Sequence, residues 1–277
     1  MIALEHVDFS FQNRVLYRDF SFRVPPGQVC LVTGINGVGK STLLRLMAGI
    51  LKPQHGRVIT HPELGARPRQ KIGFISDRLS LYEHMRVEEL VALHLRAFGV
   101  KTFDDHLLAH TRIEGRQRVR DLSVGQRTIL HLALVLAPCP RLLLLDEVIH
   151  DLDAYLRQVF LDEVLRLQGE LGMTVVCVNV NFHDIETMLD RVVLLRDGQV
   201  LLDEPLDDLR QKVRLVATSA ALPREMTWIC RRDREGYAEY VLYPYQEGWA
   251  GLLQPEPVRG MNLNDIVAAF IGGQYVA

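Results

Sequence analysis

The sequence predicts an α/β domain that is built around a parallel β-sheet, and three apolar runs carry this prediction. Arg141–Asp146 and Met173–Val180 are almost continuously apolar, which is typical of parallel strands that are buried on both faces. A third run, Gln28–Thr33, is followed by a glycine-rich loop and then by a helical segment, Lys40–Ala48, which Gly49 closes. A chain of 277 residues is long enough for one such domain and a modest appendage.

The segments around these strands complete the expected domain. Residues 2–24 alternate apolar and polar positions and end at Pro25-Pro26-Gly27, which predicts β-strands followed by a turn. Residues 78–120 are richer in charge and have helical periodicity, so we expect a helical subdomain inserted at about 78–135. Asp197-Gly198 separates two apolar runs and predicts a β-hairpin.

Beyond residue 215 the alternation of helices and strands stops. Aromatic residues gather between Trp228 and Trp249, and an amphipathic stretch, Leu263–Ile271, follows them. We therefore expect a large domain at 1–215 and a small, β-rich α+β appendage at 216–277 that ends in a helix.

Charge and hydropathy narrow the possible functions. The 32 basic and 34 acidic residues give a net charge of -2, which argues against broad binding to nucleic acid or to an anionic bilayer. We expect no nucleic-acid partner. No secretory signal is visible, and the apolar stretches are far shorter than the roughly 20 residues of a membrane-spanning helix. We expect a cytoplasmic protein, and any membrane part would come from another polypeptide.

The glycine-rich loop at 34–41 matches the phosphate-loop pattern GxxxxGK[ST]. Glycines let backbone N–H groups turn toward phosphates, and the helix that follows presents its positive N-terminus to the anion. Lys40 can neutralise phosphate charge, and the Ser41 hydroxyl can bind Mg²⁺. The candidate nucleotide-binding residues of this loop are Asn36, Gly37, Gly39, Lys40, Ser41 and Thr42.

Two carboxylates, Asp146 and Glu147, follow the apolar run of a predicted central strand. Beside a phosphate loop, the first of them fits a water-mediated Mg²⁺ ligand, and Glu147 is then placed to polarise an attacking water. The alternative, a pair of solvated acids at a strand end, loses weight because the phosphate loop is present. Glu147 and Lys40 are the candidate catalytic residues.

A third motif, LSVGQ at 122–126, precedes the helical stretch Arg127–Leu136 and then LLLLDE at 142–147. Locally, Ser123 and Gln126 predict a helix capping box. In this order and spacing, together with GILKPQHG at 49–56, the motifs resemble the LSGGQ signature and its surroundings in ABC ATPases. The resemblance covers roughly residues 2–215 and implies a P-loop (RecA-like) ABC nucleotide-binding domain.

This resemblance implies ATP and Mg²⁺ as cofactors and a head-to-tail dimer, with itself or with a paralogue, that encloses two ATP molecules. Ser123, Gly125 and Gln126 would then face the phosphates that the second subunit holds. Phe11 matches the aromatic residue that stacks on adenine in the family, although a plain strand residue is the alternative. Leu152-Asp153 matches a loop that contacts the partner subunit.

Two positions depart from the family pattern. Asp77 stands where the family has glutamine, and a carboxylate there could still bind the metal. Val180 stands where the family has its switch histidine, and His183 lies three residues later. Because a positioned polar group contributes about 10²–10⁴ in rate, we expect slow but real ATP hydrolysis.

The resemblance favours the ATP-hydrolysing subunit of an ABC transporter, which drives a separate transmembrane permease from the cytoplasmic face of the membrane. Residues 196–209 and 261–270 resemble ATPases of exporters, and this predicts the export-type branch while leaving import open. The alternatives are a regulatory subunit with slow or absent hydrolysis and a soluble assembly factor.

Overall fold

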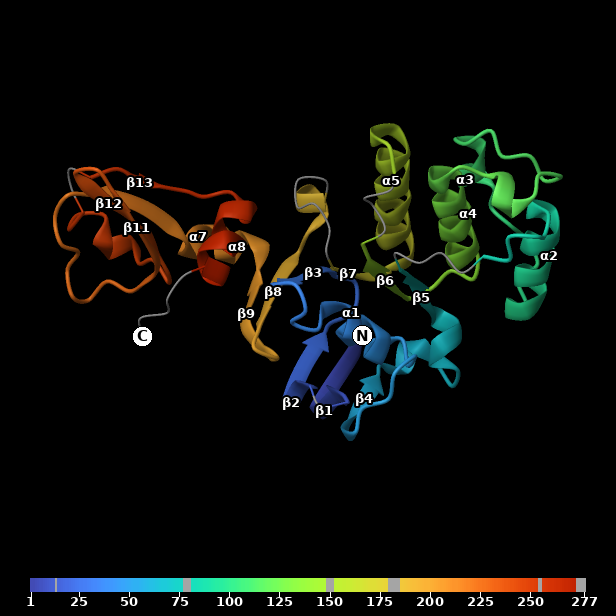
Figure 1. Ribbon diagram of the computed structural model, residues 1–277, viewed down its shortest axis with the longest axis horizontal. Coiled ribbons are helices and arrows are strands. Elements are labelled where there is room, and N and C mark those ends of the chain that lie inside the picture. The colour runs from blue at the N-terminus through green and yellow to red at the C-terminus, as the bar shows by residue number, and fades with distance from the viewer. Residues whose placement is uncertain (13, 77–80, 148–151, 179–184, 254–255, 273–277) are drawn as a thin grey trace.

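A parallel sheet forms the centre of the molecule (Figure 1). The computed structural model describes residues 1–12, 14–76, 81–147, 152–178, 185–253 and 256–272. Among these, six strands follow the order β5-β6-β7-β3-β8-β9, parallel except for the antiparallel pair β8–β9. The strands are β3 (Val29–Gly34), β5 (Ile72–Ile75), β6 (Leu142–Asp146), β7 (Thr174–Val178), β8 (Arg191–Arg196) and β9 (Gln199–Pro205). The predicted α/β class is confirmed.

The apolar runs became strands because both faces of this sheet are covered. Leu142 and Leu144 of β6 pack in one cluster with helix α1 (Lys40–Met47), which lies below the sheet in Figure 1. Leu143 and Leu145 belong to a second cluster with α4 (Val124–Leu136) and α5 (Ala154–Leu171) on the opposite face. A strand between two helical layers needs apolar side chains at every position, not alternate ones.

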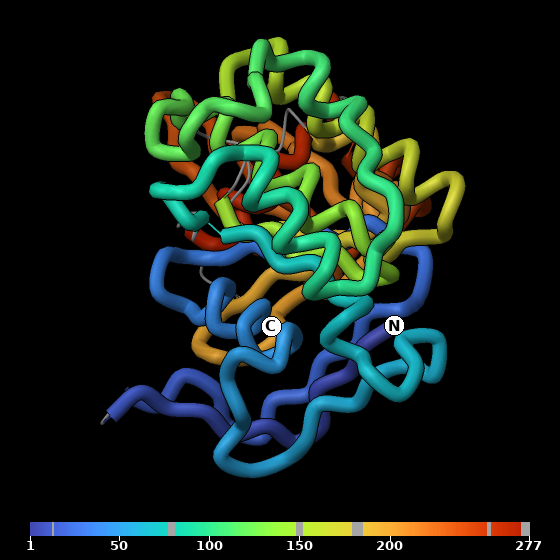
Figure 2. The backbone as a smooth tube through the Cα atoms, turned by 90° about the vertical axis from the view of Figure 1, so that its right-hand side faces the viewer, coloured from blue at the N-terminus to red at the C-terminus, as the bar shows by residue number. Residues whose placement is uncertain are grey.

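A second, antiparallel sheet has the order β2-β1-β4, with β1 (Ile2–Phe11), β2 (Arg14–Val24) and β4 (His55–Thr60). Figure 2 shows its first two strands at the base of the molecule, with the helical region at the top. Its inner face shares a core cluster with α1, so α1 lies between the two sheets. The predicted hairpin at Asp197-Gly198 joins β8 to β9, and both residues have positive φ angles, 50° and 74°.

The helical region contains α2 (Val87–Phe98), the short helix α3 (His106–Ala109) and α4. One face of α4 packs with α2 in a small cluster, and the opposite face packs in the main core against the sheet. Helix α4 therefore belongs to the helical region and to the core at once.

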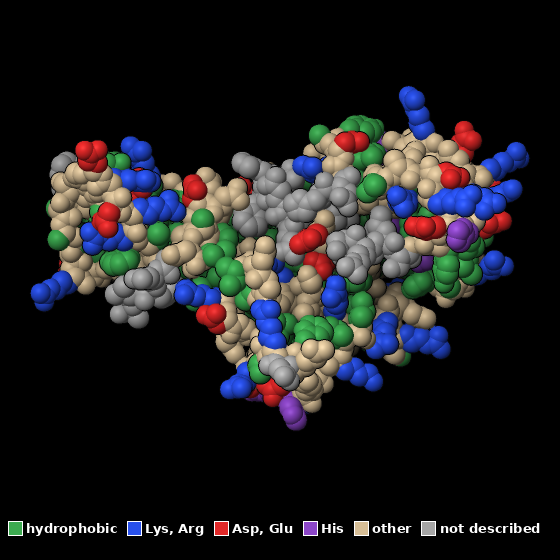
Figure 3. All heavy atoms as spheres, in the orientation of Figure 1, with side chains coloured by type: hydrophobic (Ala, Val, Ile, Leu, Met, Phe, Trp, Pro, Cys, Tyr) green, Lys and Arg blue, Asp and Glu red, His purple; other side chains and the backbone are tan. Residues whose placement is uncertain are grey.

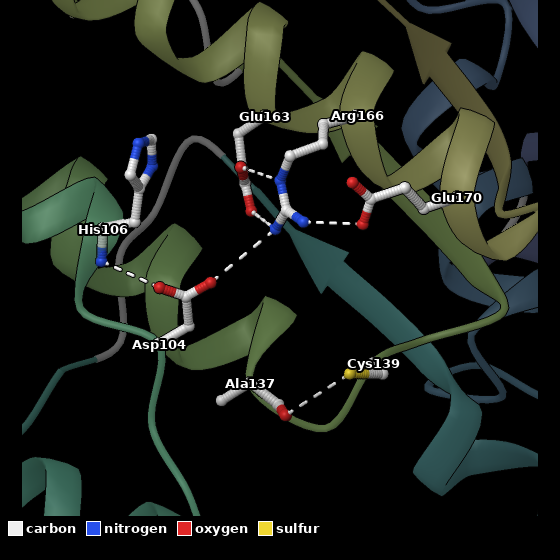
Figure 4. A network of polar contacts seen from close by, with 7 residues as sticks. All are labelled: Asp104, His106, Ala137, Cys139, Glu163, Arg166 and Glu170. Carbon is white, nitrogen blue, oxygen red and sulfur yellow. Dashed lines mark hydrogen bonds and ion pairs between the residues drawn. The ribbon is translucent and has the colours of Figure 1, made fainter.

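A polar network also ties this region to α5 (Figure 4). The Arg166 guanidinium donates two hydrogen bonds to Glu163, at 2.7 and 2.9 Å, and one to Glu170 at 2.7 Å. It also lies 3.7 Å from a carboxylate oxygen of Asp104, which precedes α3. Glu163 is only 7% exposed, so its charge depends on this arginine.

The C-terminal unit has a sheet of its own, with the order β11-β12-β10-β13. Its elements are β10 (Arg214–Thr218), β11 (Trp228–Arg234), β12 (Tyr237–Leu242), β13 (Val258–Arg259) and α8 (Leu263–Gly272), and α7 (Leu206–Lys212) leads into it. The first strand begins at Arg214, inside the range that the sequence analysis gave to the larger domain, because β10 pairs with β12 and β13. Helix α8 shares the main core with β3 and β11, so the unit is packed onto the larger domain.

On the face that Figure 3 shows, basic and acidic side chains are interspersed over the C-terminal unit and over the helical region. None of the helices in the described part of the chain is both long and apolar enough to cross a bilayer.

Candidate functional site

A cavity of about 400 Å³ opens where β3 gives way to α1. The residues that line it are Phe11, Arg14, Leu16, Asn36, Gly37, Gly39, Lys40, Ser41, Thr42 and Glu147. The structure thus gathers the phosphate-loop residues, the predicted aromatic residue and the second strand-end carboxylate around one space. A larger cavity of about 590 Å³, mostly apolar, lies at the other end of α1 beside Leu51 and Pro53, away from these residues.

Glycine is required in the loop because the chain folds tightly against its neighbours. Gly34 and Gly39 have φ angles of 145° and 119°, which side chains rarely allow. A Cβ on Gly34 would lie 2.4 Å from the Leu195 carbonyl oxygen, and one on Gly39 would lie 2.5 Å from the Tyr17 hydroxyl. Gly39 is the N-cap of α1, so the loop leads directly into a helix N-terminus that faces the cavity.

Lys40 is buried at the base of the loop, with 6% of its surface exposed. Its ammonium group donates to the carbonyl oxygens of Gly34, at 2.8 Å, and Ile35, at 3.1 Å. Burial lowers the pKa of Lys40, and the negative charges of Glu147 and Asp146 oppose that lowering. A phosphate in the cavity would meet a cation that the loop already holds in place.

Ser41 and Asp146 meet across the sheet edge. The Ser41 hydroxyl donates to a carboxylate oxygen of Asp146 at 3.0 Å, and this joins the first turn of α1 to the end of β6. Asp146 is 2% exposed. Hydroxyl and carboxylate oxygens are ligands that Mg²⁺ prefers, so the pair fits the predicted metal site.

Glu147 follows β6 directly and is exposed. Its backbone N–H donates to the Val178 carbonyl oxygen at 3.3 Å, which extends the β6–β7 ladder by one residue. Its φ angle is 60°, in the left-handed region, which costs a residue with a side chain of order 1–3 kcal/mol. The backbone turn at the strand end thus places a carboxylate at the cavity wall, where it can accept a proton from water.

The LSVGQ residues lie elsewhere. The Ser123 hydroxyl accepts a hydrogen bond from the Gln126 N–H at 3.2 Å, and the Gln126 side chain accepts one from the Ser123 N–H at 3.0 Å. This is the predicted capping box at the start of α4. Ser123, Gly125 and Gln126 do not line the cavity of the same chain.

Known proteins resemble the chain in sequence. A model of the family described as ABC transporter matches residues 17–150. The aliphatic sulfonates import ATP-binding protein SsuB 2 of Pseudomonas aeruginosa is 34% identical over 226 residues, covering 81% of this chain and 82% of that protein. The spermidine/putrescine import ATP-binding protein PotA of Protochlamydia amoebophila is 30% identical over 209 residues, covering 72% and 56% of the two chains. The chain belongs to the ABC transporter ATP-binding proteins.

Solved structures resemble this ABC protein in fold. The ATP-binding subunit of an ABC transporter has a TM-score of 0.69 at 22% identity, covering 76% of this chain and 92% of that one. The cbiO1 protein of Clostridium perfringens, part of an ABC transporter complex, has a TM-score of 0.59 at 25% identity, covering 74% and 88%. The predicted ABC nucleotide-binding fold is confirmed.

Membership of this family makes the chain an ATPase that binds ATP. It does not support the export-type branch that the sequence analysis expected, because the relatives named above are import proteins. The resemblance behind that expectation rested on two short C-terminal segments, 196–209 and 261–270, which carry none of the nucleotide motifs.

Sequence reasoning missed two residues of the cavity wall, Arg14 and Leu16. Both lie on β2, two positions apart, and Arg14 pairs with Phe11 across the β1–β2 hairpin. The sequence held one signal for them: side chains two positions apart on a strand share a face, so a nucleotide contact at Phe11 implies that alternate residues of the neighbouring strand could also line the site. Phe11 itself is 47% exposed, and its ring forms a T-shaped contact with Phe9 at a centroid distance of 4.9 Å.

Three residues of the sequence analysis lie outside the described part of the chain. They are the predicted metal ligand Asp77, Val180 in the place of the switch histidine, and His183.

Proposed function

We propose that this ABC ATPase powers import through a separate transmembrane permease. It works from the cytoplasmic face of the membrane, as a dimer that closes on two ATP molecules with Mg²⁺. Support for import comes from relatives at 34% and 30% identity that are named import ATP-binding proteins. The dimer is supported by a solved ATP-binding cassette of the same fold that is described as dimeric and bound to ADP and Pi.

One observation carries the catalytic part of the proposal: Lys40, Ser41 and Glu147 line the same cavity, and Ser41 bonds Asp146 at its edge. Asn36, Gly37, Gly39 and Thr42 complete the phosphate-binding wall. Lys40 and the N-terminus of α1 stabilise the negative charge that develops on the γ-phosphate. Glu147 orients the attacking water and accepts its proton. Mg²⁺, held by Ser41 and Asp146, would neutralise charge on the phosphate oxygens.

The second subunit completes the site. Ser123, Gly125 and Gln126 lie at the N-terminus of α4, where Ser123 is exposed and Gly125 and Gln126 are half-buried, and none of the three lines the cavity of its own chain. A helix N-terminus attracts anions, so a partner's γ-phosphate is a suitable occupant. Phe11, which is exposed and lines the cavity, would stack on adenine.

The first test is the ATPase rate of the purified chain with Mg²⁺ and after chelation. Glu147→Gln should lower the rate about 10²–10⁴-fold while ATP binding remains, and it should shift the chain to a dimer when ATP is added. Val180→His should raise the rate, because a polar group then stands in the switch position. Wild-type activity that Glu147→Gln leaves unchanged would refute the assignment of Glu147.

The direction of transport needs a separate measurement. Proteoliposomes that contain the chain with its permease should accumulate substrate on the side where the ATPase and ATP are present. Accumulation on the opposite side would refute import while leaving the ATPase mechanism intact.

A further inference from the structure

The neighbouring sheet supports the phosphate loop through two side chains of β2. The Tyr17 hydroxyl donates to the Gly39 carbonyl oxygen at 2.8 Å, and the Arg14 guanidinium donates to the Gly37 carbonyl oxygen at 2.9 Å. The four residues belong to segments that are separated by more than twenty positions in the chain. Both contacts therefore depend on how the antiparallel sheet packs against the loop.

Tyr17 is built into the core at this point. It is 1% exposed, and its ring packs against Phe20 at a centroid distance of 4.5 Å. Burial raises the pKa of Tyr17, so the hydroxyl keeps its proton and remains a donor at any physiological pH. A buried hydroxyl without a partner would be unfavourable, and the Gly39 carbonyl satisfies it.

The Gly39 carbonyl belongs to the peptide that presents the Lys40 N–H. Its oxygen also accepts the first hydrogen bond of α1, from the Leu43 N–H at 2.8 Å. In a planar trans peptide the C=O and N–H groups point in opposite directions. Two donors on the inner side of the Gly39 carbonyl therefore hold the Lys40 N–H outward, toward the cavity, where it can donate to a phosphate oxygen.

Arg14 acts on the exposed part of the loop. Gly37 has a φ angle of 79°, and the Arg14 bond to its carbonyl fixes the orientation of that peptide. Arg14 also lines the cavity, so its charge would attract a phosphate bound there. Because Arg14 pairs with Phe11 in the β1–β2 register, one hairpin end links the proposed adenine contact to the loop.

We infer that Tyr17 and Arg14 are positioning residues that preorganise the phosphate loop and thereby set the affinity of this chain for ATP and ADP. The inference rests on the proposed nucleotide site. It assigns to β2 a function that the loop motif by itself does not contain.

Isothermal titration of the full chain with ATP and with ADP tests this inference. Tyr17→Phe keeps the ring and removes only the hydroxyl, and Arg14→Met keeps most of the length and removes the donor and the charge. Each should weaken ATP and ADP binding about 3–10-fold, with the KM for ATP rising by a similar factor and kcat changing less than twofold. The matched control is Tyr243→Phe, which removes a hydroxyl bond to Glu204 on β9, and neither of these residues lines the cavity.

Three outcomes separate the possibilities. Weaker nucleotide binding by Tyr17→Phe and Arg14→Met, with Tyr243→Phe equal to wild type, supports the inference. Unchanged affinity in both β2 variants overturns it, even if Tyr17→Phe melts at a lower temperature, because a purely structural role would lower Tm alone. If the wild-type chain bound neither nucleotide, the proposed site would fail and this inference with it.

Discussion

The phosphate loop and the LSVGQ segment are held in different ways, although the proposed function needs both around one nucleotide. The loop is anchored by two strands of its own chain: β2 through Tyr17 and Arg14, and β6 through the Asp146 bond to Ser41. Ser123 and Gln126 bond each other, and Val124 between them is 49% exposed. One half of the site is therefore preorganised inside the protomer, and the other lies at the exposed start of α4, where the proposed partner subunit would meet it.

The largest effect on the ATPase rate should come from removing the positive charge of the phosphate loop, at Lys40. Lys40→Ala takes away the buried cation that is proposed to stabilise charge on the γ-phosphate, and we expect the ATPase rate to fall about 10³-fold. ATP affinity should fall as well, since the loop binds in the isolated protomer. Lys52→Ala, an exposed lysine beyond the end of α1, is the control. If Lys40→Ala retained most of its activity, the cavity would not be the catalytic site.

A second prediction concerns the stability of α4, the helix that begins at the LSVGQ segment. His131 lies on α4 and is half-buried, and its Nδ1 is buried without a hydrogen-bond partner in the described part of the chain. Burial, together with the nearby His94, lowers the pKa of His131 to about 4. Between pH 6.5 and 4 the unfolded chain then binds more protons than the folded one, so stability falls as the pH falls through this window.

The loss should reach about 3 kcal/mol at the acid end, since each pKa unit corresponds to about 1.4 kcal/mol. Denaturant unfolding at a series of pH values measures it. His131→Leu should flatten the slope between pH 6.5 and 4, whereas His55→Leu, at an exposed position, should leave it unchanged. An identical slope in wild type and His131→Leu would show that other groups cause the acid sensitivity.

The Arg166 network tests the second attachment of the helical region. Arg166→Leu leaves Glu163 buried without its partner and removes the link to Asp104, and we expect a loss of about 2 kcal/mol in the free energy of unfolding. The double variant Glu163→Leu/Arg166→Leu should recover part of that loss, because no unpaired charge remains. Nucleotide affinity should stay the same in both variants. A double variant whose free energy of unfolding is no higher than that of Arg166→Leu would contradict this account.

The difference between the two halves also explains what could be predicted from sequence. The apolar runs determine the sheet because each strand is covered on both faces, and the loop motif is local, so Lys40 and Ser41 could be assigned from spacing alone. Asp146 and Glu147 follow from the end of such a run. These inferences require only neighbours in the chain.

Long-range supports leave no comparable local pattern. Tyr17 is an ordinary aromatic residue of a strand in the sequence, and only the packing of β2 against the loop brings its hydroxyl to Gly39. Glu163 and Glu170 lie at helical spacing from Arg166, but Asp104 comes from a segment more than fifty residues earlier. The start of β10 at Arg214 depends likewise on pairing with distant strands.

The smallest predicted effect separates the two roles of Ser123. As an N-cap it stabilises α4, and as a donor it is proposed to contact the γ-phosphate of a partner. Ser123→Ala removes both functions, so we expect about 1 kcal/mol less stability and a roughly tenfold lower ATPase rate. Ser123→Asp separates the two functions. Aspartate caps a helix as well as serine does, and its negative charge is stabilising at a helix N-terminus, but the same charge repels phosphate. It should keep wild-type stability and wild-type affinity of the protomer for ATP while losing ATP-induced dimerisation and hydrolysis. A Ser123→Asp chain that still hydrolysed ATP at the wild-type rate would limit Ser123 to capping, and the half of the site that the partner subunit is proposed to supply would then have to be sought elsewhere.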